Sequence, residues 1–241
     1  MVITSLENKK VKDVVKLQNK KYRDLTNTFV IETEHLVEEA EKAGIVKELF
    51  LVVDEFVDRD DTYFVTKEVM KKMSTMESPS NVLAVCEKSN SKEIIGNKIL
   101  LLDEIQDPGN LGTIIRSSVA FGVTTIILSP DTVDLYNPKV IRASEGMFCH
   151  LNIITMDLEE AIKTIKSKGI KVYGTNVVNG TDVKELNDIK SFALVMGNEG
   201  NGVKQHIQEL CDENLYIPMN KTCESLNVGV ACSILLYELG D

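Results

Sequence analysis

The residues best suited to chemistry lie in a stretch, 101–122, that reads LLDEIQDPGNLGTIIRSSVAFG. Its Asp-Pro-Gly at 107–109 is typical of a turn, because proline presets one backbone dihedral and glycine permits a positive one. Asn110 is then the predicted N-cap of a helix that ends at Gly122. Arg116 lies outside the apolar face of that helix. Any chemistry that the protein performs is expected at this turn, although on spacing alone the pattern is a strand, a turn and a surface arginine.

Two further loops have the residue types of a ligand site. Residues 197–202, GNEGNG, follow an apolar strand, and their glycines let backbone N–H groups approach a ligand closely. The loop lacks a dinucleotide fingerprint and the lysine of a P-loop, and its carboxylate, Glu199, would repel phosphate but could orient the guanidinium of Arg116. Residues 217–227 lead into an apolar C-terminal helix that Ser225 is predicted to cap.

All three loops follow strands of a predicted α/β domain in which strands and helices alternate. Such alternation gives a mostly parallel sheet covered by helices on both faces, and ligands bind these sheets at the carboxyl ends of the strands. That rule selects the three loops. The predicted strands are 99–102, 124–128, 151–154, 171–174, 192–196 and 215–217, and the predicted helices are 110–121, 138–143, 158–168, 203–210 and 225–239.

The N-terminal part is predicted to be a separate small α/β domain, residues 1–90. A polar linker, residues 91–98, joins it to the domain at 99–241. The small domain begins with a predicted basic helix over Asn8–Arg23. Its other predicted elements are strands at 28–33, 49–53, 63–65 and 82–86 and helices at 34–43 and 67–73.

Charge is unevenly distributed along the chain. The formal net charge is −10, which argues against indiscriminate nucleic-acid binding, since such binding rests on lysine and arginine contacts to phosphate. Residues 1–23, however, hold seven basic side chains against two acidic ones, a net +5 that leaves −15 for the remainder. This segment is either a solvated amphipathic helix or a local basic face for docking on a structured RNA.

Composition predicts a globular protein of the cytoplasm. No apolar run reaches the roughly 18 to 20 residues that a membrane helix needs, and the N-terminus has no continuous apolar segment to serve as a signal peptide. The five cysteines lack the spacing of a zinc site, and the three histidines form no obvious triad. We therefore expect no metal and assign these residues no catalytic role.

Taken together, the three stretches resemble the signature motifs of the SpoU, or TrmH-like, branch of the SPOUT RNA methyltransferases. The resemblance is carried by DEIQDPGNLGTIIRSSVAFG, then LVMGNEGNGV, then IPM followed by SLNVGVA, and by the segments 134–139 and 141–144 between the first two. The N-terminal part is similar to the family's small ribosomal-protein-like substrate-binding domain, through ITSLENKKVKDVVKL, FVIETEHLVEEA and SPSNVLAV.

This resemblance implies a trefoil knot in the C-terminal domain, S-adenosylmethionine as cofactor, a homodimer, and methylation of a ribose 2′-hydroxyl in RNA. Ribosomal RNA is favoured over transfer RNA, because the N-terminal domain resembles domains that dock on ribosomal RNA. By family position, the catalytic or near-catalytic residues are Asn110, Arg116, Glu199, Ser225 and Asn227, and the cofactor contacts are Thr175, Gly197, Ile217 and Leu226.

Arg116 is the family's candidate for activating the hydroxyl, yet a guanidinium has a pKa above about 12 and is a poor base. We therefore interpret Arg116 as a clamp on the neighbouring phosphate that stabilises negative charge developing on the ribose oxygen. In this interpretation Glu199 and Asn110 fix the orientation of the guanidinium. In the family's dimer the arginine is thought to serve the cofactor bound by the partner chain.

The chain departs from the family pattern at Gly229, where a serine is usual, at Glu145, where a small or apolar residue is usual, and at Thr33, where a glycine is usual. Two other classes remain open: a catalytically idle RNA-binding or assembly protein on the same fold, and a dinucleotide-dependent oxidoreductase. Retention of the predicted catalytic residues argues against the first, and the lack of fingerprint glycines after the first strand argues against the second.

Overall fold

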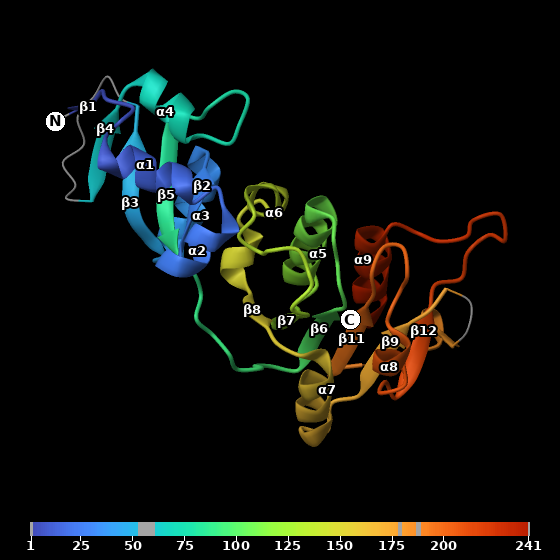
Figure 1. The fold of residues 1–241 in the computed structure, drawn as a ribbon. Helices are drawn as coiled ribbons and strands as arrows, with labels where there is room; N and C mark the ends of the chain where they lie inside the picture. Colours follow the sequence, from blue (N-terminus) through green and yellow to red (C-terminus); the bar gives the residue numbers. More distant parts are fainter. Residues whose placement is uncertain (1, 53–60, 178–179, 187–188, 241) are drawn as a thin grey trace. The chain divides into compact units, whose positions relative to one another are not determined.

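The computed structural model describes residues 2–52, 61–177, 180–186 and 189–240. The chain forms two compact units, one of residues 1–90 with 134–149 and one of residues 91–133 with 150–241 (Figure 1). This grouping differs from the predicted division at a 91–98 linker, because the segment 134–149 packs with the N-terminal part. None of the helices in the described ranges is long and apolar enough to cross a membrane.

A five-stranded sheet forms the centre of the first unit, in the order β1-β4-β3-β5-β2. β5 runs antiparallel to its two neighbours, and the other pairs are parallel. Helices α1 and α4 pack on a buried apolar cluster that includes Val14, Met70 and Leu83. Residue 53 of the predicted strand 49–53 lies outside the described residues. The elements are β1 Val2–Ile3, α1 Lys9–Lys16, α2 Lys20–Thr26, β2 Thr28–Glu32, α3 Glu34–Lys42, β3 Val46–Leu51, β4 Thr62–Val65, α4 Lys67–Met73, β5 Val82–Glu87 and α6 Pro138–Ala143.

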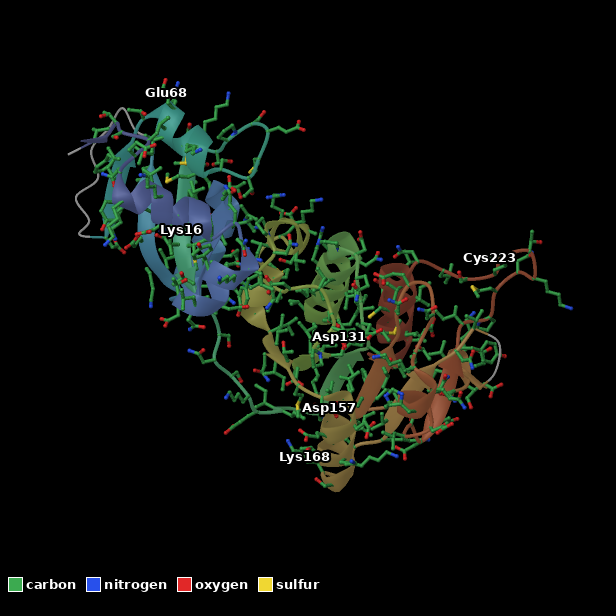
Figure 2. All side chains as sticks on the ribbon, viewed as in Figure 1. Lys16, Glu68, Asp131, Asp157, Lys168 and Cys223 are labelled. Atoms are coloured by element: carbon green, nitrogen blue, oxygen red, sulfur yellow. The ribbon has the colours of Figure 1, made fainter. Side chains whose placement is uncertain are left out.

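The single basic helix predicted over Asn8–Arg23 is wrong, because the chain forms two helices there. The side chain of Asn19 accepts a hydrogen bond from the backbone of Lys21 and starts α2 after a short turn. The charge of this segment is also largely compensated, so it does not present a continuous basic face. The ion pairs are Lys10–Glu48, Lys12–Glu7, Lys16–Asp13 (Lys16 is labelled in Figure 2), Lys20–Asp24 and Arg23–Asp134.

The segment 134–149 is held in the first unit by a buried ion pair and by aromatic contacts. Arg23, whose side chain is 5% exposed, pairs with Asp134 at 2.6 Å. The ring of Phe29 lies 4.5 Å from that of Tyr136 and 5.8 Å from that of Phe148. Aromatic pairs add about 0.5–1.5 kcal/mol beyond the area that they bury. The segment is therefore a packed part of this unit, although its neighbours in sequence belong to the other.

A seven-stranded sheet forms the second unit, in the order β10-β12-β9-β11-β6-β7-β8, and every described pair is parallel. Helices α5 and α9 pack together over one face, and α7 and α8 cover the other (Figure 1). This confirms the predicted α/β class with a mostly parallel sheet, while the trefoil knot stays a prediction. The elements are β6 Lys98–Leu102, α5 Pro108–Ala120, β7 Thr125–Leu128, β8 Asn152–Thr155, α7 Leu158–Ser167, β9 Val172–Thr175, β10 Thr181–Asp182, β11 Phe192–Met196, α8 Gln205–Gln208, β12 Glu213–Tyr216 and α9 Val228–Leu239.

Two predicted helix caps are wrong, and both errors concern the proposed site. Asp107 caps α5, since its side chain accepts the backbone N–H of Asn110 at 2.9 Å and the proline after it suits the first helical position. Asn227 caps α9 in place of Ser225. The predicted stop at Gly122 is confirmed, because this glycine has a φ of 74° and directly follows Phe121, the C-cap residue of α5. The correct caps free the side chain of Asn110 for other contacts.

Candidate active site

Three loops meet at the carboxyl ends of β6, β11 and β12, as the strand rule predicts. β11 lies beside β6 in parallel, with Met196 opposite Leu102 at the last position of each strand. The backbone N–H of Asp103 continues this ladder and donates to the Met196 carbonyl at 2.8 Å. The loops that follow, 103–107 and 197–204, therefore start side by side.

A chain of hydrogen bonds joins the three loops through Glu199, Asn110 and Asn227. The Asn110 Nδ2 donates to Glu199 Oε1 at 3.0 Å, and the Asn227 Nδ2 donates to Asn110 Oδ1 at 2.8 Å. The backbone N–H groups of Gln106 and Asp107 also donate to the Glu199 carboxylate, at 3.1 and 3.0 Å. Asn110 is thus bonded to one residue 89 positions away and to another 117 positions away, and the three form one polar cluster.

The start of α9 determines which side-chain atom is the donor and which the acceptor in the hydrogen bonds that link Asn227, Asn110 and Glu199. The Asn227 Oδ1 accepts from the backbone N–H groups of Gly229 and Val230, so its Nδ2 is left to donate to Asn110. The Asn110 Oδ1 is then used as an acceptor, and its Nδ2 faces Glu199 as a donor. A carboxylate that collects this many N–H donors is favoured in its ionised form.

The pKa of the Glu199 carboxyl reflects these contacts. The limited burial of Glu199 acts to raise its pKa, but hydrogen bonds from Asn110 and from the backbone of Asp107 and Gln106 outweigh that effect. The pKa of Glu199 is consequently lowered from its ordinary value of 4.5. Near neutral pH this residue is a charged acceptor that ties the loops together.

The predicted pairing of Glu199 with Arg116 is wrong for this chain. Arg116 is exposed on α5 and makes no hydrogen bond or ion pair with any described residue of its own chain. The reason is geometric: Arg116 follows Asn110 by six residues, or about 9 Å along a helix, and the nearer N–H donors already occupy the Glu199 carboxylate. Asn110 and Glu199 are hydrogen-bonded to each other, and the described part of the chain offers Arg116 no partner.

The glycine loop is clamped onto the end of β6 by residues that the sequence did not single out. A Cβ added at Gly197 would lie 2.1 Å from the Gly202 carbonyl carbon, so only glycine allows the two sides of the loop to touch. The carboxylate of Asp103, 2% exposed, accepts the backbone N–H of Lys204 at 2.8 Å, and Asn198 donates to the Glu104 carbonyl at 2.9 Å. A polar residue at the end of an apolar strand was the available signal for Asp103.

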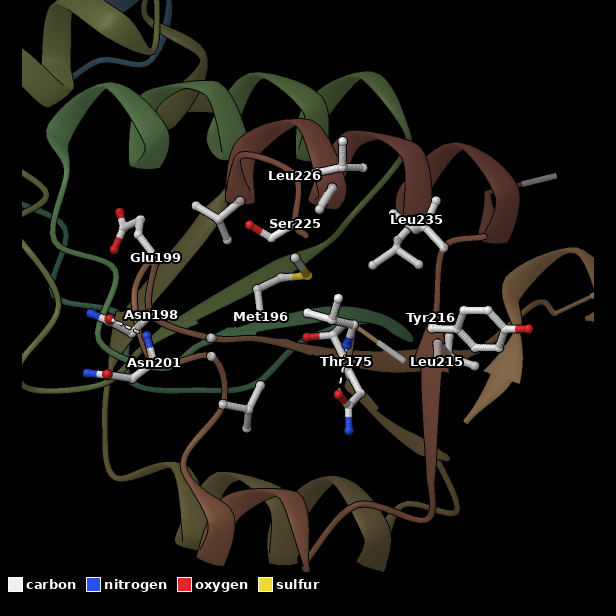
Figure 3. A pocket seen from close by; sticks show the side chains of 18 of the residues that line it. Thr175, Met196, Asn198, Glu199, Asn201, Leu215, Tyr216, Ser225, Leu226 and Leu235 are labelled. Atoms are coloured by element: carbon white, nitrogen blue, oxygen red, sulfur yellow. Dashed lines mark hydrogen bonds between the residues drawn. The ribbon is translucent and has the colours of Figure 1, made fainter. Parts of the chain in front are cut away.

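A cavity of about 350 Å³ opens beside the glycine loop. All four predicted cofactor residues line it, together with Glu199 and Ser225, whereas the other three predicted catalytic residues do not. Figure 3 shows Thr175, Met196, Ser225 and Leu226 arranged around this space, with Glu199 at its edge. The lining includes Thr175, Gly197, Ile217 and Leu226, and the residues outside it are Asn110, Arg116 and Asn227.

The lining suits S-adenosylmethionine better than a dinucleotide. The volume of the cavity falls in the usual range for small-molecule sites, about 300–1,000 Å³. Among the described residues that line the cavity there is no lysine, arginine or histidine, and Glu199 is the charged side chain. A diphosphate would lack a cationic partner here, while a positively charged sulfonium group is compatible with backbone carbonyls and a carboxylate.

Comparison with protein families assigns both parts of the chain. A model described as the SpoU rRNA Methylase family matches residues 97–237, and a model described as the MRM3-like substrate binding domain matches residues 8–84. Because the first match spans more than half of the chain, the chain belongs to the SpoU rRNA methylase family.

Relatives with similar sequences and structures agree with this assignment. The chain is 42% identical, over 98% of each chain, to the 23S rRNA (guanosine(2553)-2′-O)-methyltransferase RlmP of Bacillus subtilis (strain 168). It is 30% identical to the AdoMet-bound rRNA methyltransferase from Sinorhizobium meliloti, with a TM-score of 0.89 over 99% of this chain and 97% of that one. The AdoMet complex of the SpoU methyltransferase AviRb from Streptomyces viridochromogenes shares the fold, with a TM-score of 0.86 over 97% of each chain at 24% identity.

The protein is therefore an S-adenosylmethionine-dependent RNA 2′-O-methyltransferase, which confirms the class that the sequence predicts.

Proposed function

We propose that this enzyme methylates the ribose 2′-hydroxyl of a guanosine in 23S ribosomal RNA, as the name of its Bacillus relative describes for that protein. The observation that carries the proposal is the polar cluster of Glu199, Asn110 and Asn227 at the edge of a cavity whose described lining has no cationic side chain. An idle RNA-binding protein would have no need to keep this cluster beside a ligand cavity.

The cavity residues would hold the cofactor. S-adenosylmethionine, when bound, supplies the methyl group. Thr175, Gly197, Ile217 and Leu226 form walls of the cavity and would contact the cofactor largely through backbone and apolar groups. Ser225, which lines the same space, would lie on the side of the incoming ribose. Glu199 keeps the glycine loop in place through its bonds to Asn110 and the backbone of Asp107.

Arg116 would serve the RNA. Its guanidinium has no partner among the described residues of its own chain, so it is available to clamp a phosphate and to stabilise negative charge on the ribose oxygen. The exposed face of α9 supports the homodimer that would bring this arginine to the partner's cofactor. Val230 and Tyr237, two turns apart on that helix, are 46% and 61% exposed. We place the enzyme in the cytoplasm, where ribosomal RNA is its substrate.

Transfer of a labelled methyl group tests the substrate. Purified enzyme would be incubated with labelled S-adenosylmethionine and either a 23S rRNA transcript or bulk transfer RNA, with cofactor binding measured separately by calorimetry. We expect cofactor binding, no dinucleotide binding, and label in a guanosine of the 23S transcript. Label in transfer RNA alone would establish the alternative substrate, and cofactor binding without transfer to either RNA would favour the idle protein.

A further inference from the structure

Most of the cationic side chains around α1 and α2 are neutralised by carboxylates of their own unit, but those of α6 are not. Within the part of the chain that the structure describes, neither Lys139 nor Arg142 forms an ion pair. The two lie three residues apart on α6, so they share one face of the helix. The two side chains therefore form a local cationic face on a chain with a net charge of −10.

The guanidinium of Arg142 donates to an exposed threonine that is itself bonded to a buried carboxylate of the first unit. Its Nη1 donates to Thr75 Oγ1 at 2.9 Å. The Thr75 hydroxyl in turn donates to Glu32 Oε1 at 2.7 Å, and the Thr75 backbone N–H donates to the same oxygen at 2.8 Å. Ser74 donates to the other oxygen of Glu32, which is 5% exposed. Three hydrogen-bond donors therefore hold this carboxylate, and no cationic side chain of the described residues pairs with it.

Among the described residues, the network uses one of the N–H donors of Arg142. Because the Thr75 hydroxyl gives its proton to Glu32, only its lone pairs face Arg142, and the guanidinium must be the donor. Of the five N–H groups of a guanidinium, four then have no acceptor among the described residues. A planar fork of N–H donors fits two oxygens of one phosphate.

We infer that Arg142, oriented by Thr75 and Glu32 and supported by Lys139, is a phosphate-binding site for the RNA backbone on the first unit. The inference rests on the proposed function only in taking RNA as the partner. Arg142 would contact the RNA, whereas Thr75 and Glu32 are positioning residues. The contact would contribute affinity and register but no base specificity, because phosphate is the same at every nucleotide.

Equilibrium binding at several salt concentrations tests this site without relying on catalysis. The full chain and its variants would be titrated into a fluorescent 23S rRNA fragment between 50 and 300 mM KCl. For Arg142→Gln we expect affinity at 100 mM KCl to fall about tenfold and the slope of log K against log [KCl] to become shallower by about 1. Affinity within twofold of the parent enzyme with an unchanged slope would overturn the inference.

Variants of Thr75 separate positioning from charge. Thr75→Val keeps every charge but removes the hydroxyl, so we expect several-fold weaker binding with the salt slope retained, and Thr75→Ser should recover most of that affinity. Equal affinities for these two variants would contradict the positioning role. Lys163→Gln, which removes one exposed charge from α7 in the second unit, is the charge-matched control. Failure of the parent enzyme to methylate the fragment would refute the proposed substrate and leave the binding comparison intact.

Discussion

Arg116 differs from Glu199, Asn110 and Asn227, because its side chain has no partner among the described residues of its own chain. Glu199, Asn110 and Asn227 satisfy one another, and their geometry is complete in one protomer. The structure thus separates three of the predicted catalytic residues, which form a structural cluster, from Ser225, which lines the cavity, and from Arg116, whose guanidinium has no partner among the described residues. This division favours a role for Arg116 that begins only when RNA is present.

Arg116→Lys tests that role at the residue scale. A lysine keeps the charge but cannot form the planar two-point contact with a phosphate. We expect kcat to fall at least about 100-fold, with the dissociation constant for S-adenosylmethionine unchanged, as for the loss of a transition-state donor. The readout is single-turnover methyl transfer beside calorimetry. Near-normal turnover by this variant would rule out the clamp.

The pH dependence of stability tests the ionised state of Glu199. Its pKa is lowered in the folded protein, so it contributes stability that is fully present above its ordinary pKa of 4.5 and is lost as the pH falls through the folded value. We expect the difference in unfolding free energy between the parent and Glu199→Gln to be largest near pH 7 and to shrink below about pH 4.5. Urea unfolding across this range measures it, and a difference independent of pH would contradict the assignment.

The packing of α5 against α9 explains a departure from the family pattern. A Cβ added at Gly229 would lie 3.1 Å from Thr113 Cγ2 and 3.3 Å from Asn227 Oδ1. The serine that is usual at this position would therefore crowd both the neighbouring helix and the cap of α9. Ser117 and Ser233 hydrogen-bond across the same helix pair at 2.6 Å, which leaves little freedom for the helices to separate.

A double-mutant cycle on Gly229→Ala and Thr113→Ala tests this contact. Alanine is favoured over glycine in a helix by roughly 0.5–1 kcal/mol, but in the parent background crowding by Thr113 should cancel that gain. Thr113→Ala removes the Cγ2 methyl group but keeps Cβ, which would lie 3.2 Å from the added Cβ. It should therefore restore part of the gain, with a coupling free energy of about 0.5 kcal/mol. Thermal or chemical unfolding of the four proteins gives the value, and additivity within about 0.3 kcal/mol would show that the contact is relaxed.

The elements were predictable where a strong local pattern sets them. The predicted bounds of α4, α6 and β11 are confirmed to the residue, because each is a short apolar-patterned run with clear turn or capping signals. The caps of α5 and α9 were misassigned, since Asp107 and Asn227 compete with equally good capping residues nearby. Choice between such neighbours depends on the proline at position 108 and on contacts from distant loops.

The residues of the site could be predicted from the sequence, but the hydrogen bonds between them could not. The strand-end rule places Asn110, Glu199 and Ser225 on neighbouring loops, which the structure confirms. The partner of Glu199 could not be derived from spacing, because Asn110 and Arg116 lie on the same helix and only the tertiary path of the glycine loop selects one. The clamp of Asp103 on Lys204 likewise joins residues 101 positions apart.

At the scale of the whole molecule, the two units carry separate tasks. The second unit holds the cavity and the polar cluster, and the first unit holds the phosphate site inferred on α6. If Arg116 serves the cofactor of a partner protomer, Arg116→Ala mixed with a cavity variant such as Leu226→Arg should regain methyl transfer in heterodimers. In an equal mixture half of the dimers are heterodimers, and each of these has one intact site of its two. We therefore expect recovery of up to about a quarter of parent activity. Stable heterodimers with no activity would refute the shared site.

The central claim is that this enzyme methylates a guanosine ribose in 23S ribosomal RNA. Mass mapping of ribose methylation in RNA from cells that make the parent protein, the Arg116→Ala variant or no protein tests it most directly. We predict that one 2′-O-methylguanosine of 23S rRNA is present with the parent protein and absent in the other two, with transfer RNA unchanged. An unaltered 23S rRNA, or a loss confined to transfer RNA, would contradict the account.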